Sequence, residues 1–215
     1  MRTLSNRVLL LFASAILALF QFGVAAASAD ESTWTVIDGG RTNAHGSSIY
    51  FFDATTGSTA GCSDSDLIVR FRDGTGLSGA GLVMITYGTL NYCQANGGPP
   101  IEIHPRGLPW KMNATSYDAQ TGTTTGTLTS DDAAGISVVA SIDSVPCELT
   151  AGGPGTDKGE IQTTYNNETG ELGFTDTNLV IKSASSSCGG LVEAGDPIMI
   201  SAQYYVWPTP TITNP

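Results

Sequence analysis

The sequence predicts an all-β fold, an antiparallel β-sandwich or barrel-like domain held together by two disulfides. Short runs of β-branched and aromatic residues recur about every 8 to 15 residues, and turn-forming Gly, Asn, Asp and Pro separate them. No window after residue 29 places apolar residues at helical spacing between helix-forming polar neighbours. Four cysteines follow an amino-terminal segment that is typical of exported proteins. These three observations argue against a mainly helical domain.

The first 29 residues have the features of a signal peptide. Two arginines give a positively charged start, residues 8–20 are apolar, and Ala27-Ser28-Ala29 fits the small residues of a cleavage site. The apolar run is shorter than the ~20 residues that a membrane-spanning helix needs, and no other stretch has that length. We therefore expect residues 1–29 to be removed, no membrane insertion after cleavage, and one secreted β-domain over residues 30–215.

Strand patterns in the first half of the exported chain are short and rich in Val, Ile, Tyr and Phe. Turn residues bound each run, as expected for strands that are joined by tight loops. On this basis we predict strands at 34–37, 48–52, 67–72, 82–87 and 101–104.

The run at residues 110–117, near the middle of the chain, shows the clearest strand period. Trp110 and Met112 fall on one face of this run, and Lys111 and Asn113 fall on the other, as in a half-buried strand. We expect a central strand here that places Trp110 in the core.

The second half of the chain contains both strong alternation and a clear turn. Residues 136–142 and 198–206 alternate apolar with polar side chains, which is typical of antiparallel sheets with one solvated face. An Asn- and Gly-rich loop at 166–170 predicts a hairpin between the runs on either side of it. Two sheets packed face to face, or a flattened barrel, would bury the apolar faces. The strands predicted in this half are 123–128, 136–142, 159–165, 171–175, 179–182 and 198–206.

The four cysteines, Cys62, Cys93, Cys147 and Cys188, predict two disulfides. Three pairings are possible. The sequential one, Cys62 with Cys93 and Cys147 with Cys188, gives each half of the chain its own bridge. The second cysteine of each pair is also followed by a turn and by a predicted strand with matching apolar spacing. An internal repeat is therefore an alternative, in which the domain consists of two similar halves, 30–118 and 119–215.

The exported chain is strongly acidic. Removing the two arginines of the signal peptide from nine basic residues leaves seven against 20 acidic ones, a formal charge of −13. Nucleic acids and anionic lipids require concentrated Lys and Arg, so we expect neither as a partner. The acidic residues are scattered, which indicates a role in solubility. For one cluster, Asp64-Ser65-Asp66, Ca²⁺ binding is the alternative to a role in solubility, because Ca²⁺ takes clustered oxygen ligands.

No stretch carries a signature of catalysis, of a cofactor or of a metal site. The chain after residue 29 has only His45, in a predicted loop, and His104, at the end of a predicted strand, and we expect both to be surface or structural residues. There is no G-x-S-x-G motif, and the cysteines are better explained as bridged than as zinc ligands. We therefore expect no catalytic, cofactor-binding or metal-binding residues, and a protein that is not an enzyme.

Aromatic residues are the remaining resource for binding. Tyr205 falls on the polar face of its predicted strand, and Trp207 follows two residues later. Large aromatic side chains on a solvated face are suited to stacking on sugars or to packing against a protein. We take Tyr205 and Trp207 as the candidate binding surface.

Leu108-Pro109-Trp110, the run Asn113 to Asp118 and the run Thr121 to Gly126 are the most specific of a series of segments along the chain that the four cysteines accompany. This series resembles a family of small secreted actinobacterial proteins whose function is unknown. The resemblance spans nearly all of the chain after residue 29. It implies export, two disulfides and an all-β fold, and it brings no catalytic residues. Asp131-Asp132 and residues 152–158 depart from the family's pattern.

Taken together, these features predict a secreted, non-catalytic module that binds glycans or envelope proteins through a sheet face or through loops at one end. Two alternatives remain open at this point. One is a secreted hydrolase that uses two of the carboxylates, a pair that spacing alone does not identify. The other is an inhibitor of secreted hydrolases that presents a rigid loop beside a disulfide.

Overall fold

A computed structural model describes residues 33–142 and 144–215; the predicted signal peptide, residues 1–29, lies outside the described residues. The described residues belong to one compact unit. They form antiparallel β-structure, accompanied by a single 3₁₀ turn at Ser186–Cys188. The predicted all-β fold is therefore confirmed. No helix in the described part of the chain has the length and apolar character that a membrane crossing requires.

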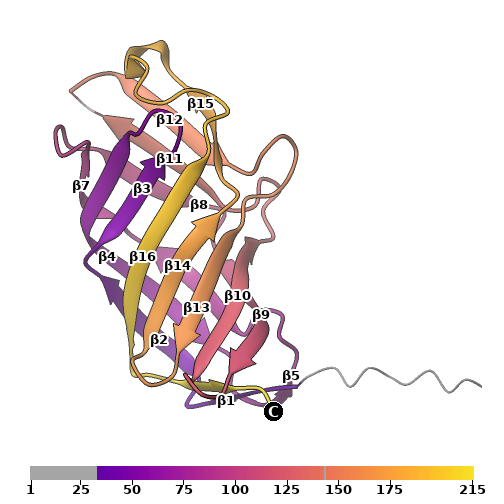
Figure 1. The fold of residues 1–215 in the computed structure, drawn as a ribbon. Coiled ribbons are helices and arrows are strands. Elements are labelled where there is room, and N and C mark those ends of the chain that lie inside the picture. Colours follow the sequence, from indigo (N-terminus) through magenta and orange to yellow (C-terminus); the bar gives the residue numbers. More distant parts are fainter. Residues whose placement is uncertain (1–32, 143) are drawn as a thin grey trace, which may run out of the picture. The chain divides into compact units, whose positions relative to one another are not determined.

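Eight strands close into a barrel-like sheet (Figure 1). Each strand is antiparallel to its neighbours, and the pairing of β14 with β16 joins the two ends of the sheet. In order around the barrel, the strands are β14 (Glu171–Thr177), β13 (Ile161–Asn166), β10 (Thr123–Ser130), β9 (Trp110–Asp118), β6 (Val83–Gly88), β4 (Thr59–Phe71), β2 (Gly40–Gly46) and β16 (Ile198–Trp207).

Two of these strands, β4 and β16, continue beyond the barrel. Between their extensions lies β3 (Ile49–Asp53), which pairs with both, while β7 (Asn91–Ala95) pairs with the other side of β4. A separate sheet faces this extension, in the order β15 (Val180–Ala184), β12 (Cys147–Gly152), β11 (Ser137–Ile142) and β8 (Glu102–Arg106). This end of the molecule is consequently a two-layered sandwich that is continuous with the barrel (Figure 1).

A small sheet lies at the opposite end of the barrel, in the order β17 (Thr211–Thr213), β1 (Trp34–Ile37) and β5 (Gly74–Leu77). Its apolar side chains Trp34, Val36 and Ile212 are buried. The Asn167 side chain bonds both backbone groups of Ile212, with its Nδ2 donating to the carbonyl at 2.7 Å and its Oδ1 accepting from the N–H at 2.9 Å. These contacts fasten the carboxyl-terminal strand to the β13–β14 turn.

Side-chain alternation follows the predicted pattern. Along β16, every second residue from Ile198 to Val206 is buried, and the residues between them are exposed. Trp110 and Met112 of β9 are buried as well, which confirms the predicted anchor in the core. Burying one face of each strand against the opposite wall is what a closed sheet requires, and it explains the strict period of two.

Both disulfides have the sequential pairing. Cys62 of β4 is bonded to Cys93 of β7, and Cys147 of β12 to Cys188 of the 3₁₀ turn, so no cysteine is free. Each bridge lies within one of the two predicted halves. The strands of the two halves share one barrel, because β16 pairs with β2 and β3 from the first half. The internal repeat itself stays a prediction.

Several strands were missed by the sequence patterns. The largest omission is β2, whose residues are polar or small and were predicted to form a loop that contains His45. This segment is a strand because β4 and β16 flank it and satisfy its backbone groups on both sides. Local composition carries little information about such a strand, since its stability comes from its neighbours. The strands β5, β7, β12 and β17 were missed as well.

Candidate functional site

A groove of about 410 Å³ lies on the outer face of β3, β4 and β7. Its floor is formed by β4, where Thr59, Gly61 and Ser63 alternate with side chains that turn the other way. All three are small, so the floor is depressed relative to the strands on either side. The groove is a consequence of the strand period, which places three small residues in a row on one face.

Two tyrosines form the walls of this groove. Tyr50 of β3 is paired with Gly61, and a Cβ atom added to that glycine would lie only 3.2 Å from the Tyr50 ring. On the other side, Tyr92 of β7 lies between the paired positions Asn91 and Cys93. Tyr50 is 57% exposed and Tyr92 is 81% exposed, so both rings are open to solvent. Ser47, Cys62, Gln94 and Gly97 complete the lining.

Tyr92 has an unusual backbone conformation. Its φ angle of 50° lies in the left-handed region, which a bulky residue rarely adopts. Such strain persists only where the surroundings over-determine the conformation, and it concentrates at functional positions. Here the next residue, Cys93, is bonded to Cys62 of the floor strand. The disulfide thus holds the wall that carries Tyr92 against the floor of the groove.

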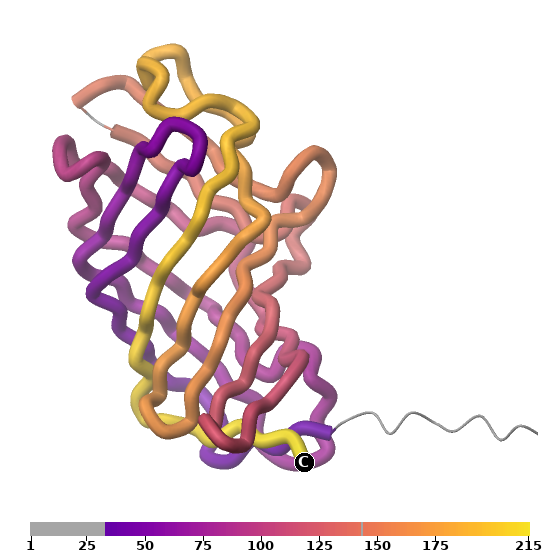
Figure 2. Tube along the Cα trace, in the orientation of Figure 1, coloured from indigo at the N-terminus to yellow at the C-terminus, as the bar shows by residue number. Residues whose placement is uncertain are grey.

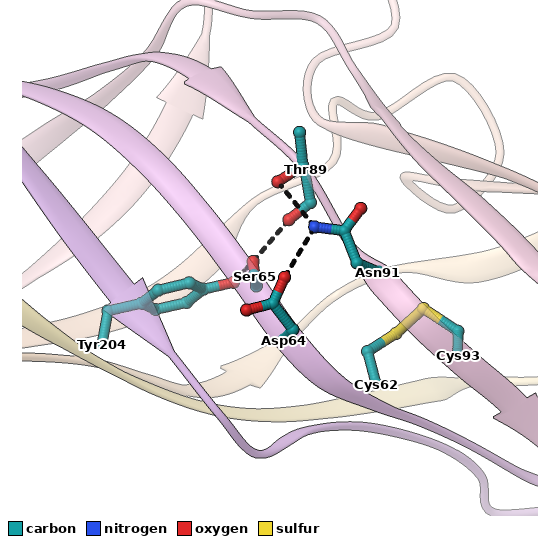
Figure 3. Close-up of a disulfide and its surroundings, with 7 residues drawn as sticks. All are labelled: Cys62, Asp64, Ser65, Thr89, Asn91, Cys93 and Tyr204. Carbon is teal, nitrogen blue, oxygen red and sulfur yellow. Dashed lines mark hydrogen bonds between the residues drawn. A yellow bond between two sulfur atoms is a disulfide. The ribbon is translucent and has the colours of Figure 1, made fainter.

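A hydrogen-bond network lies beside the disulfide and fixes the same strands (Figure 3). Asn91 Nδ2 donates to Asp64 Oδ2 at 2.8 Å, which ties β7 to β4. Ser65, whose side chain points inward, donates its hydroxyl proton to the Thr89 carbonyl. The Tyr204 hydroxyl therefore serves as the donor in its 2.9 Å bond to Ser65 Oγ. The network joins β4, β7 and β16 around a buried phenol.

Burial of this phenol is expected to make the fold sensitive to alkali. Removal from water raises the pKa of Tyr204 from 10.0 to about 12, and the hydrogen bond between Tyr204 and Ser65 opposes this shift. Because the unfolded tyrosine ionises first, the stabilisation is complete below about pH 10 and is lost as the pH rises toward 12. The free energy of unfolding of the wild type should fall between about pH 8 and pH 11.5. In Tyr204→Phe, which has no phenol to ionise at this position, we expect that fall to be smaller by roughly 2 kcal/mol, measured by urea unfolding at each pH.

Tyr205→Phe is the matched control for this measurement, since it removes an exposed hydroxyl one residue away. It should keep the alkaline profile of the wild type. Identical profiles for all three proteins would show that Tyr204 is not buried as described.

Three ionisable side chains meet on the outer face beside the groove. His45 of β2 faces two carboxylates of β4, with its Nδ1 3.2 Å from Asp66 Oδ1 and 3.8 Å from Asp64 Oδ1. One ligand atom from each of the three lies within 4.8 Å of the others, so the group could contact a cation. Ser65 of the predicted Ca²⁺ cluster points inward and takes no part. Ca²⁺ takes about six to eight oxygen ligands, so two carboxylates supply only part of a site, and Ca²⁺ binding stays a prediction.

The predicted binding residues, Tyr205 and Trp207, lie on the outer face of β16 and are 55% and 80% exposed. Tyr205 is paired with His45 and Glu171, and Trp207 with Asn43, so both sit over the barrel. They do not line the groove. The β16 residue that pairs with Tyr50 is Ser201, four positions before Tyr205, which corresponds to a separation of roughly 13 Å along the strand.

The sequence patterns did not identify the groove, although they carried part of the signal. Tyr50 alternates with the apolar residues Ile49 and Phe51, which predicts an outward ring. Tyr92 stands beside a cysteine that was correctly predicted to be bridged. The sequence patterns did not predict that β3 and β7 pair with the same segment of β4, and only the tertiary structure shows this pairing.

Two carboxyl groups of the described residues have clearly shifted pKa values, and both are lowered. The backbone N–H of Gln120 and the Thr121 hydroxyl lower the pKa of Asp118, and the hydrogen bond from Lys111 lowers that of Asp131. A hydrolase acid needs the opposite shift, because it must stay protonated near neutral pH. The two carboxylates of the cluster described above, Asp64 and Asp66, lie next to His45 on the outer face.

No protein-family model, curated protein or solved structure matches this chain. The resemblance of its central segments to a family of secreted actinobacterial proteins accordingly stays a prediction.

Proposed function

We propose that this protein is a secreted, non-catalytic module that binds a neutral glycan in the groove between Tyr50 and Tyr92. The observation that carries the proposal is the arrangement of two exposed tyrosines across a floor of small residues. One of them, Tyr92, is held in a strained conformation beside a disulfide. Rigid aromatic walls lose little conformational freedom when a ligand binds, which favours affinity.

The chemistry of the lining suits a sugar. The C–H faces of a pyranose ring stack on aromatic rings, and its hydroxyl groups both donate and accept hydrogen bonds. Alongside the two tyrosines, the groove offers three hydroxyl groups and one amide, from Ser47, Thr59, Ser63 and Gln94. Its volume of about 410 Å³ falls within the range of about 300 to 1,000 Å³ that is typical of ligand sites.

Charge favours a neutral ligand over an acidic one. No Lys or Arg lines the groove, and the chain after residue 29 carries a formal charge of −13. An acidic polysaccharide would meet like charge and no cationic partner, which weakens association.

Secretion is part of the proposal. Two disulfides are typical of extracellular proteins, because cytosolic reductants keep most thiols reduced. The amino-terminal charge, apolar run and small-residue site add the features of an export signal.

Removing either wall of the groove is expected to abolish most of the binding. Tyr92→Ala and Tyr50→Ala should each weaken the affinity for a neutral oligosaccharide by about tenfold or more, because aromatic anchors contribute disproportionately to binding. The measurement is a neutral-glycan array with the purified protein lacking residues 1–29, followed by titration calorimetry on the glycans that are retained.

Tyr205→Ala is the matched control, since it removes an equally exposed tyrosine from the barrel face. It should leave the affinity unchanged. If Tyr205→Ala and not Tyr92→Ala reduces binding, the ligand sits on β16 instead of in the groove. Cleavage of a bound polymer would favour the hydrolase alternative, and retention of envelope proteins with no glycan bound would also overturn the proposal.

A further inference from the structure

A second cavity, of about 90 Å³, lies between the two layers of the sandwich. Its walls are almost entirely apolar, with Phe51 from one layer and Ile103, Val138 and Ala140 from the other. Exposed residues such as Asn96 and Leu191 also line it, so the cavity reaches the surface.

The opening lies where two loops meet. The turn that joins β3 to β4 and the loop that precedes β16 run side by side at one end of the molecule (Figure 2). The Thr56 hydroxyl in the first loop donates a 2.8 Å hydrogen bond to the Leu191 carbonyl in the second. Both loops are therefore part of the rim.

Of the polar residues that line this cavity, Asp53, Ser58, Thr59 and Asn96, only Asp53 is buried, with 2% of its surface exposed. It ends β3 on the same strand face as Ile49 and Phe51, the face that is turned toward the second layer. Its Oδ1 accepts backbone N–H bonds from Thr55 at 2.8 Å and Thr56 at 3.1 Å. Its Oδ2 is buried and has no hydrogen-bond partner among the described residues.

This oxygen indicates which kind of ligand the cavity would suit. An ionised carboxylate only accepts hydrogen bonds, and one that is buried against apolar side chains is costly unless a donor or a cation meets it. None of the salt bridges found among the described residues involves Asp53. A ligand that enters from the rim can supply both the donor and the positive charge.

We propose that the cavity binds a short primary alkylammonium ion, whose ammonium group donates to Asp53 Oδ2 while its alkyl chain occupies the apolar walls. A cavity of about 150 Å³ accommodates benzene, so 90 Å³ corresponds to a chain of about four carbons. The formal charge of −13 also attracts cations to the protein. The site is independent of the groove, because Asp53 and Phe51 point inward from β3 while Tyr50 points outward.

The proposal is tested with n-butylammonium, 1-butanol and butyrate as probes, on the disulfide-intact protein lacking residues 1–29. We expect butylammonium to bind more tightly than butanol by about tenfold or more, and butyrate not to bind, as judged by chemical-shift titration. Asp53→Asn keeps an oxygen that caps Thr55 and Thr56 but replaces Oδ2 with an amide. It should weaken butylammonium by about tenfold and leave butanol within about threefold.

A second variant tests the location of the site. Ala140→Leu places three further carbons in the cavity and should eliminate binding of both butylammonium and butanol. Equal affinity of the wild type for the amine and the alcohol would overturn the proposal, because Asp53 would then contribute nothing. Binding that survives both substitutions, with the fold checked by circular dichroism, would overturn it as well.

Discussion

Replacing Cys62 and Cys93 together with alanine is expected to lower the free energy of unfolding and to weaken glycan binding. The bridge closes a loop of sequence separation 31, for which the chain-entropy estimate of the stabilisation is roughly 3.5 to 4 kcal/mol. It also joins the groove floor to the strand of Tyr92, whose left-handed backbone needs support from its surroundings. The two effects are measured by urea unfolding and by calorimetry with the retained glycan.

The other disulfide provides the control. Cys147 and Cys188 have a sequence separation of 41, so their double replacement should destabilise the protein by a similar amount. Neither residue lines the groove, and the affinity for glycan should stay within about threefold of the wild type. If both double variants weaken binding equally under conditions where they remain folded, the Cys62–Cys93 bond has no special role in the groove.

Gly159→Ala is expected to be among the most destabilising single substitutions in the chain. A Cβ atom at this position would lie 1.9 Å from the Ile136 carbonyl oxygen and 2.6 Å from Leu179 Cδ2. The backbone cannot move away easily, because Ile136 N–H donates to the Gly159 carbonyl at 2.9 Å and Gly159 N–H to the Ala134 carbonyl at 3.1 Å. We expect a loss of about 3 kcal/mol or more, measured by urea unfolding.

Gly152→Ala is the matched control for this clash. Gly152 is also buried, but the atoms nearest to an added Cβ are side-chain carbons of Lys182 and Ser137 at 3.5 and 3.6 Å, which is ordinary contact. Its stability should stay within about 1 kcal/mol of the wild type. If the two alanine variants are equally stable, then Gly159 does not approach Ile136 as closely as described.

Elements with a strong period of two were predictable because the information is local. Burial alternates along β16 and over the first four residues of β9, Trp110 to Asn113, as their sequences indicate, and one apolar face is enough to define such a strand. The cysteine pairing was also predictable, since sequential bridges are short and each stays within one half of the chain. By contrast, β2 was missed, because a strand of small and polar residues depends on neighbours that lie far away in the sequence.

The candidate site was less predictable than the fold. Outward rings at Tyr205 and Trp207 follow from the strand period, and both side chains are exposed. A groove needs a second condition, which is that outward residues of different strands lie next to one another. That condition depends on strand order and register, which are set by the whole barrel.

The sequence by itself determined the all-β class, the two disulfides and the inward or outward direction of side chains in its alternating runs, because each of these follows from residue types at short spacing. Only the tertiary structure decided that Tyr50 and Tyr92 line the same groove, since they come from different strands that pair with the same segment of β4. It also decided that Asp53, an ordinary turn residue in the sequence, has an unpaired oxygen in an apolar cavity. Contacts between distant strands are fixed by closure of the barrel and by packing of the second layer, and these are properties of the whole chain.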